Sequence, residues 1–138
     1  MLRGLTTVAY AAFDHEGAKR WYADLLGVEP YFDRPEYVEF RIGDYQHELG
    51  IINTARFGAL GAEAPESSAP GGAIVYWHVD DVPVTLARLE AMGATIHHPP
   101  RDFGEGFIGA AVVDPFGNIL GIMHNPHYLD VLAGIGEV

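Results

Sequence analysis

Apolar and polar positions follow strand-like and helix-like spacings along most of the chain. Residues 5–10 (LTTVAY) are apolar and β-prone and predict a strand. Asp14 then stands where a helix N-cap is expected, and Gly27 stands where a helix commonly ends. The apolar positions between them, at helical spacing, are Ala18, Trp21, Tyr22, Leu25 and Leu26. Two more β-like runs follow, at 37–42 (YVEFRI) and 48–52 (ELGII), so the first half predicts a strand, a helix and further strands.

The second half of the chain repeats this order. Residues 73–79 (AIVYWHV) predict a strand, and Asp80 or Asp81 is the expected cap of a helix with Pro83 in its first turn. Its apolar face comprises Val82, Leu86 and Leu89. Gly93 ends the helix, as far from Asp80 as Gly27 is from Asp14. The β-like runs after it are residues 95–98, 107–113 and 119–123.

The repeat defines the expected domain organisation. The letters LGI close both halves, at 49–51 and 120–122, and the stretch between the halves is rich in Ala, Gly, Pro and Ser. Half a chain of this size is too small to bury a good core by itself, so we expect both halves to act as one domain. The predicted parts are module one at 3–58, a linker at 59–72, module two at 73–127 and a C-terminal tail at 128–138.

Composition narrows the functional classes. The 138 residues are 49% apolar, which is typical of a globular protein, and no apolar run is long enough to cross a membrane. The net charge of −11 argues against nucleic acid as a partner, because phosphate binding needs clustered Lys and Arg. The acidic excess serves solubility or attracts a cationic ligand. The chain has no cysteine and no signal-peptide pattern, and we expect a cytoplasmic protein.

An ordered set of residues in both halves follows a known pattern. Its members are Asp14, Ala18, Trp21, Tyr22, Leu26 and Gly27, then Val79, Asp80, Asp81, Leu89, Gly93, Ala94 and the turn Asp114-Pro115-Phe116-Gly117-Asn118. In this order they resemble the vicinal-oxygen-chelate superfamily, which includes glyoxalase I, extradiol dioxygenases and bleomycin-resistance proteins. The resemblance implies an α+β fold: two tandem βαβββ modules form a paired, cup-shaped mixed sheet with helices on its outer face. It also implies a homodimer.

Metal-dependent relatives place four potential metal-binding positions in that cup. By the resemblance, three of these positions are Thr7, Ile74 and Gly121 here, and the fourth is Glu48, or Gly50 if the register shifts by two. Of these residues only Glu48 has a side chain suited to a divalent ion. We therefore expect neither a metal nor another cofactor. A site rebuilt from histidines elsewhere in the chain is the alternative.

Counting every second residue from these positions predicts the lining of the cup. The expected ligand-contacting residues are Thr7, Ala9, Gly50, Ile52, Ile74, Tyr76, Gly121 and Met123. Glu48 and His78 are the candidate acid–base residues. Glu48 has three possible roles: a general base, an anchor for a cationic ligand, or the ion-pair partner of Arg41.

Two functions follow from the sequence. The first is a glyoxalase/bleomycin-resistance-like protein that binds a small, apolar or cationic ligand in the cup without a metal. The second is an enzyme of the isomerase or lyase kind, or a dioxygenase-like one. It would use Glu48 and His78 as acid–base groups, or a rebuilt metal site.

Overall fold

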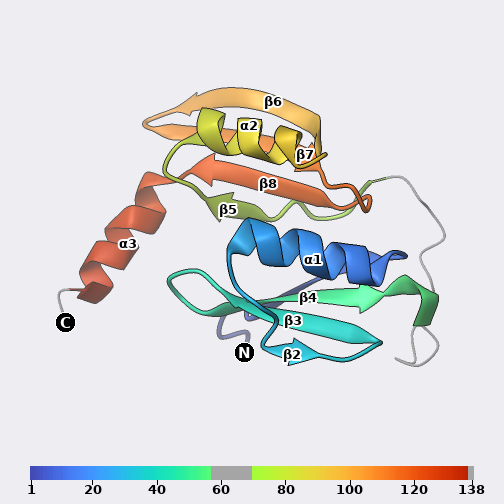
Figure 1. Ribbon diagram of the computed structural model, residues 1–138. Coiled ribbons are helices and arrows are strands. Elements are labelled where there is room, and N and C mark those ends of the chain that lie inside the picture. The colour runs from blue at the N-terminus through green and yellow to red at the C-terminus, as the bar shows by residue number, and fades with distance from the viewer. Residues whose placement is uncertain (57–69, 137–138) are drawn as a thin grey trace. The chain divides into compact units, whose positions relative to one another are not determined.

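The computed structural model describes residues 1–56 and 70–136, which fall into two compact units, Met1–Ser68 and Ala69–Val138 (Figure 1). Each unit contains one four-stranded mixed sheet and a helix that packs against it. The predicted α+β class and the tandem order of the modules are therefore confirmed. Residues 59–69 of the predicted linker lie outside the described residues.

The first unit follows the predicted order closely. Its elements are β1 (Thr7–Ala12), α1 (His15–Leu26), β2 (Phe32–Asp33), β3 (Tyr37–Ile42) and β4 (His47–Asn53). The strand order is β1-β4-β3-β2, with β1 parallel to β4 and the other neighbours antiparallel. The carboxylate of Asp14 caps α1 by accepting from the Gly17 N–H at 3.0 Å, and Gly27 ends the helix at φ 69°. The predicted caps are correct, and only the two-residue β2 was not predicted.

The core of the first unit lies between α1 and one face of its sheet. Val38, Phe40, Leu49 and Ile51 are fully buried there, and such side chains each contribute roughly 1.5–3 kcal/mol to stability. The buried His15 adds a polar link between the layers, since its Nε2 lies 2.8 Å from the carbonyl oxygen of Ile51. In the described part of the first unit, residues 1–56, no helix covers the other face of the sheet.

The second unit repeats the arrangement. Its elements are β5 (Tyr76–His78), α2 (Val82–Ala91), β6 (Thr95–Gly104), β7 (Phe107–Val113), β8 (Ile119–His124) and α3 (Pro126–Gly136). The strand order is β5-β8-β7-β6, with β5 parallel to β8. Asp81, and not Asp80, caps α2, because its carboxylate accepts from the Val84 N–H at 3.0 Å. Leu86 and Leu89 of α2 are buried as predicted.

In the second unit, two predicted strand boundaries were wrong and one helix was not predicted. β5 is shorter than the predicted strand at 73–79, so Ile74 precedes it. β6 is longer than predicted and continues through Pro99 and Pro100, which an edge strand with register shifts can contain. The predicted tail at 128–138 is mostly α3, whose first turn is capped by the Asn125 side chain, 3.1 Å from the Tyr128 N–H. Asn followed by Pro is a helix start signal that the prediction overlooked.

No helix in the described residues is both long and apolar enough to span a membrane.

Candidate functional site

The open face of the first sheet, defined here as the face away from α1, gathers the polar side chains of three strands. Pairing places Thr7 beside Glu48 and Ala9 beside Gly50 on β1 and β4. Tyr10, on the other face of β1, instead approaches Tyr22 of α1, with 6.0 Å between ring centroids. The predicted strand parity therefore agrees with the structure. The open face comprises Thr7, Ala9, Tyr37, Glu39, Arg41, Glu48, Gly50 and Ile52.

Two carboxyl groups meet on this open face. Glu39 on β3 and Glu48 on β4 lie within hydrogen-bonding reach of one another. Hydrogen bonding with Glu39 is the main cause of the raised pKa of Glu48, followed by partial loss of solvent and repulsion by the charge of Glu39. Arg41 and the Thr7 hydroxyl, 3.5 Å from Glu48 Oε1, act in the opposite direction and lower the pKa. We call Glu39 and Glu48 the carboxyl pair.

Tyr37 extends the carboxyl pair into a short chain of hydrogen bonds. Its hydroxyl donates to Glu39 Oε1 at 2.8 Å. Burial, and then the bond to Glu39, raise the pKa of Tyr37 well above its usual range, so the hydroxyl keeps its proton and remains a donor. The chain Tyr37–Glu39–Glu48 can therefore hold or release a proton at its carboxyl end.

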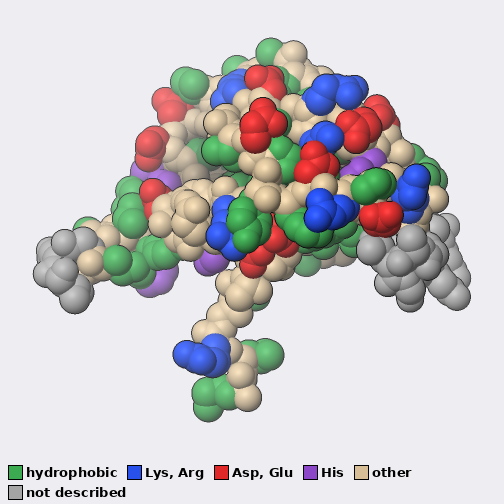
Figure 2. Space-filling view, turned by 60° about the horizontal axis from the view of Figure 1, so that its bottom comes forward, with side chains coloured by type: hydrophobic (Ala, Val, Ile, Leu, Met, Phe, Trp, Pro, Cys, Tyr) green, Lys and Arg blue, Asp and Glu red, His purple; other side chains and the backbone are tan. Residues whose placement is uncertain are grey.

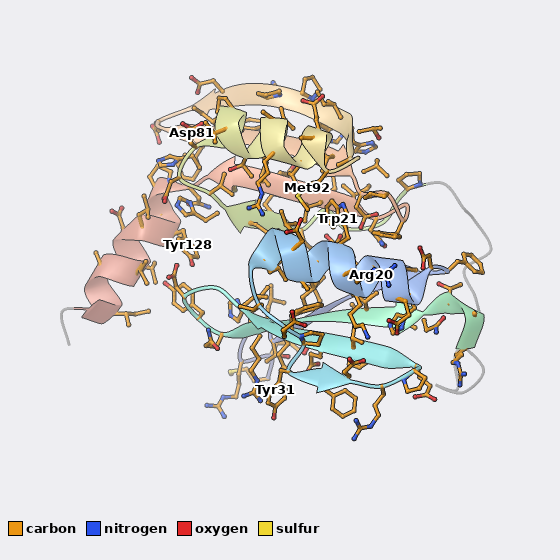
Figure 3. The ribbon with its side chains drawn as sticks, viewed as in Figure 1. Arg20, Trp21, Tyr31, Asp81, Met92 and Tyr128 are labelled. Carbon is orange, nitrogen blue, oxygen red and sulfur yellow. The ribbon has the colours of Figure 1, made fainter. Side chains whose placement is uncertain are left out.

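Aromatic rings and guanidinium groups lie next to the carboxyl pair. Arg41 stacks on Tyr31, with its Cζ 3.7 Å from the ring centroid, and Arg34 lies 4.9 Å from the Phe32 centroid. Tyr31 is 61% exposed and points to the side of the sheet away from α1 (Figure 3). Within residues 1–56 and 70–136, Glu48 forms no ion pair with Arg41 at 4.0 Å or less. The alternative that Arg41 neutralises Glu48 directly is therefore not supported.

In the second unit, His78 is engaged at the end of β5. Its Nδ1 accepts from the backbone N–H of Asn125 at 3.1 Å, and its Nε2 lies 3.4 Å from Asp80 Oδ1. The Tyr128 ring stacks on it at 4.8 Å between centroids, and His124 is 5.3 Å away (Figure 3). These contacts link β5 to the start of α3, so they suit a structural role for His78 better than a role as a mobile proton carrier.

Tyrosine rings cover two glycines of the predicted lining. The place where a Cβ on Gly121 would stand is 2.8 Å from Tyr76 Cδ1, and the Tyr37 ring and hydroxyl lie even closer to the Cβ position of Gly50. Neither Gly50 nor Gly121 therefore leaves open space beside its backbone. Of the other predicted lining residues, Ile52 and Met123 are half-buried, and the Met123 sulfur lies 3.6 Å from the Asn125 amide nitrogen.

Comparison with known proteins now identifies the family. Residues 4–122 match the sequence profile of the Glyoxalase/Bleomycin resistance protein/Dioxygenase superfamily. The chain belongs to this superfamily. None of the curated proteins compared with the chain matches it.

Solved structures of this superfamily share the fold at low identity. A glyoxalase-related enzyme from Fulvimarina pelagi is 24% identical, with a TM-score of 0.73 over 91% of this chain and 90% of that chain. A lactoylglutathione lyase from Agrobacterium tumefaciens is 20% identical, with a TM-score of 0.69 over 93% and 98% of the two chains. An enzyme of the superfamily from Burkholderia phytofirmans is 17% identical, with a TM-score of 0.68 over 88% and 98%. At these identities the likeness establishes the fold alone.

The residues of this superfamily member do not suit a divalent metal at the positions inferred from the resemblance. Ala9 pairs with Gly50 just as Tyr76 pairs with Gly121, so the register and the two LGI segments make Gly50, and not Glu48, the counterpart of Gly121. Both counterparts are glycines covered by tyrosine rings. No group of three or more His, Asp or Glu side chains in the described residues has a geometry that could hold a metal ion.

Glu39 and Tyr37 are site residues that the prediction missed. The alternation in YVEFRI places Tyr37, Glu39 and Arg41 on one face, and that signal was already present in the sequence. The register that aligns this face with Glu48 comes only from the pairing of β3 with β4. Acidic and basic side chains are interleaved on the face shown in Figure 2, without a broad basic patch there that would suit nucleic acid.

Proposed function

We propose that this protein binds a small cationic molecule with apolar groups on the open face of the first sheet, without a metal ion. The carboxyl pair is the observation that carries the proposal. Two carboxylates this close repel one another when both are ionised, and a bound cation removes that repulsion. The pair therefore offers more attraction to a cation than a single exposed carboxylate does.

The surrounding rings favour an organic cation over a metal ion. Tyr31 and Phe32 already carry guanidinium groups of the chain itself, which demonstrates that their faces accept planar or bulky cations. Phe32 also lies 6.4 Å from Tyr37 between ring centroids, so apolar surface continues up to the carboxyl pair. A hydrophobic ammonium ion would contact both kinds of surface.

An enzyme of the isomerase or lyase kind remains the alternative, and the raised pKa of Glu48 is the observation that favours it. A carboxyl group whose pKa is raised is a stronger base than an ordinary one, and the Tyr37 hydroxyl orients its partner Glu39 by donating a hydrogen bond to it. His78 contributes less to this alternative because its Nδ1 is occupied by the Asn125 N–H. A rebuilt metal site, which a dioxygenase-like member would require, has no matching donor cluster in the described residues.

Calorimetric titration with benzyltrimethylammonium tests the binding proposal. The raised pKa of Glu48 means that this carboxyl group carries a proton at low pH and is ionised only above its pKa. Affinity should therefore rise with pH through that range, and binding should release a proton, which is detected as a buffer-dependent heat. Glu48→Gln and Glu39→Gln should each abolish the pH dependence.

Glu90→Gln is the matched control, since it removes one exposed negative charge from α2 of the second unit. If Glu90→Gln weakens binding as much as Glu48→Gln, the attraction comes from net charge and the proposed site is wrong. Elemental analysis that finds about one equivalent of a transition metal, lost in Glu48→Gln, would overturn the metal-free part of the proposal.

We also propose a cytoplasmic homodimer. The cysteine-free composition supports a reducing compartment. Each sheet, taken alone, ends in edge strands, β1 and β2 in the first and β5 and β6 in the second. Exposed edges are commonly covered by a partner chain, which supports self-association.

A further inference from the structure

Two aromatic side chains of the second unit lie across glycines on neighbouring strands. Tyr76, from β5, covers Gly121 on β8 and extends toward Gly109 on β7, where its Cε1 is 3.8 Å from the place of a missing Cβ. Phe103, from β6, approaches the same place from the other side, with its Cε2 at 3.3 Å. The glycines therefore allow both rings to lie close to the backbone of the sheet. We call Tyr76 and Phe103 the aromatic shelf.

The aromatic shelf remains accessible despite its contact with the sheet. Tyr76 is 43% exposed and Phe103 is 59% exposed. Both are large apolar side chains, and in a soluble chain such rings are more usually buried. The neighbouring Gly109 and Gly121 are themselves buried beneath them. The arrangement thus holds aromatic surface at the open side of the sheet, where side chains larger than glycine would have displaced it.

A guanidinium group borders the shelf. Arg101 pairs with Gly109 across β6 and β7, and its Cζ lies 5.1 Å from the centroid of the Phe103 ring. In residues 1–56 and 70–136, Arg101 forms no ion pair, so its guanidinium is available to an anionic group of a ligand. The net charge of −11 opposes anion binding only weakly at this range, because physiological salt screens charges beyond about 8 Å.

We propose that the aromatic shelf binds a planar aromatic carboxylate, whose ring stacks on Tyr76 and Phe103 while its carboxylate pairs with Arg101. Offset or edge-on ring contacts supply the ring affinity, and the guanidinium provides a planar, two-pronged match for a carboxylate. The inference rests on the proposed small-molecule function and adds a second ligand class, with an opposite charge, on the other sheet.

Titration of 15N-labelled full-length protein with naphthalene-2-carboxylate tests the shelf. The amide signals of Gly109 and Gly121 should shift through ring-current effects, and the saturated analogue decahydronaphthalene-2-carboxylate should bind about three- to tenfold more weakly. Tyr76→Leu and Phe103→Leu keep apolar volume but remove the rings, and each should weaken the binding of naphthalene-2-carboxylate by a similar factor. Arg101→Gln should remove the preference for the carboxylate over 2-naphthamide.

Phe13→Leu is the control, since Phe13 is an aromatic residue of the first unit that is even more exposed, at 79%. Equal binding of the planar and saturated acids, or equal losses in Phe13→Leu and Tyr76→Leu, would overturn the shelf. If naphthalene-2-carboxylate fails these tests while benzyltrimethylammonium still binds with the expected pH dependence, this inference alone is overturned. Loss of ammonium binding with an intact shelf would instead overturn only the cation proposal.

Discussion

Gly121→Ala is expected to destabilise the protein, although one methyl group is all that it adds. The new Cβ would stand 2.8 Å from the Val75 carbonyl oxygen and 2.8 Å from Tyr76 Cδ1. The first contact is with backbone that cannot turn away, because the Val75 carbonyl accepts the Gly121 N–H at 3.0 Å. The methyl group must therefore displace both the ring and the junction of β5 with β8.

The expected magnitude is the difference between two opposing effects. Overpacking of this kind costs about 1–3 kcal/mol. Replacing a strand glycine by alanine raises the free energy of unfolding by about 0.5–1 kcal/mol, because the unfolded chain loses conformational freedom. The free energy of unfolding should therefore fall by roughly 1–2 kcal/mol. Adding Tyr76→Ala should restore only part of this loss, since the contact with Val75 remains.

Urea denaturation followed by tryptophan fluorescence provides the measurement, because Trp77 is adjacent to Tyr76 on β5. Gly134→Ala is the control: a Cβ at Gly134 meets nothing within 4 Å, and it lies in α3, where alanine is favoured. That variant should be neutral or more stable. If Gly121→Ala is as stable as the parent protein, the ring does not cover Gly121, and the argument against a metal at this position loses its main support.

Two further predictions concern α3 and self-association. His78→Leu removes the acceptor of the Asn125 N–H and the ring stacked on Tyr128, which should cost roughly 1 kcal/mol. Amide hydrogen exchange in the first turn of α3 should therefore accelerate about fivefold. His127→Leu, at an exposed position, is the control and should leave the exchange unchanged. Unchanged exchange in His78→Leu would mean that α3 is held by other contacts. Sedimentation at micromolar concentration should give a dimer, and a single species at the chain mass of 15.0 kDa would refute the homodimer.

The predictable features of the fold were those encoded locally. Asp14 and Gly27 define the ends of α1 through their own side chain or backbone, independently of the rest of the chain. Strand parity was equally local, because alternation in the sequence assigns Tyr10 and Thr7 to opposite faces. The Asn125-Pro126 start of α3 was also a local signal, and the prediction did not use it.

The site was less predictable because it depends on pairing between distant strands. Glu48 was identified from its position on one strand, but its pKa is governed by Glu39, which lies across the sheet in a register that the sequence does not state. The covering of Gly50 and Gly121 likewise depends on how distant strands pair. Gly50 and Gly121 appear as empty positions in the sequence, whereas Tyr37 and Tyr76 occupy the space from neighbouring strands.

The two units have diverged at equivalent positions, and this divergence connects the two proposed ligands. Ala9 and Tyr76 occupy matching places beside Gly50 and Gly121. With the small Ala9 on the neighbouring strand, Gly50 is covered from β3 by Tyr37, whose hydroxyl binds the carboxyl pair. With Tyr76 on the neighbouring strand, Gly121 is covered by an exposed ring from β5 itself. The exchange of a small for a large residue between β1 and β5 therefore decides which strand covers the glycine, and the carboxyl groups on β3 and β4 add the acidic character of the first sheet.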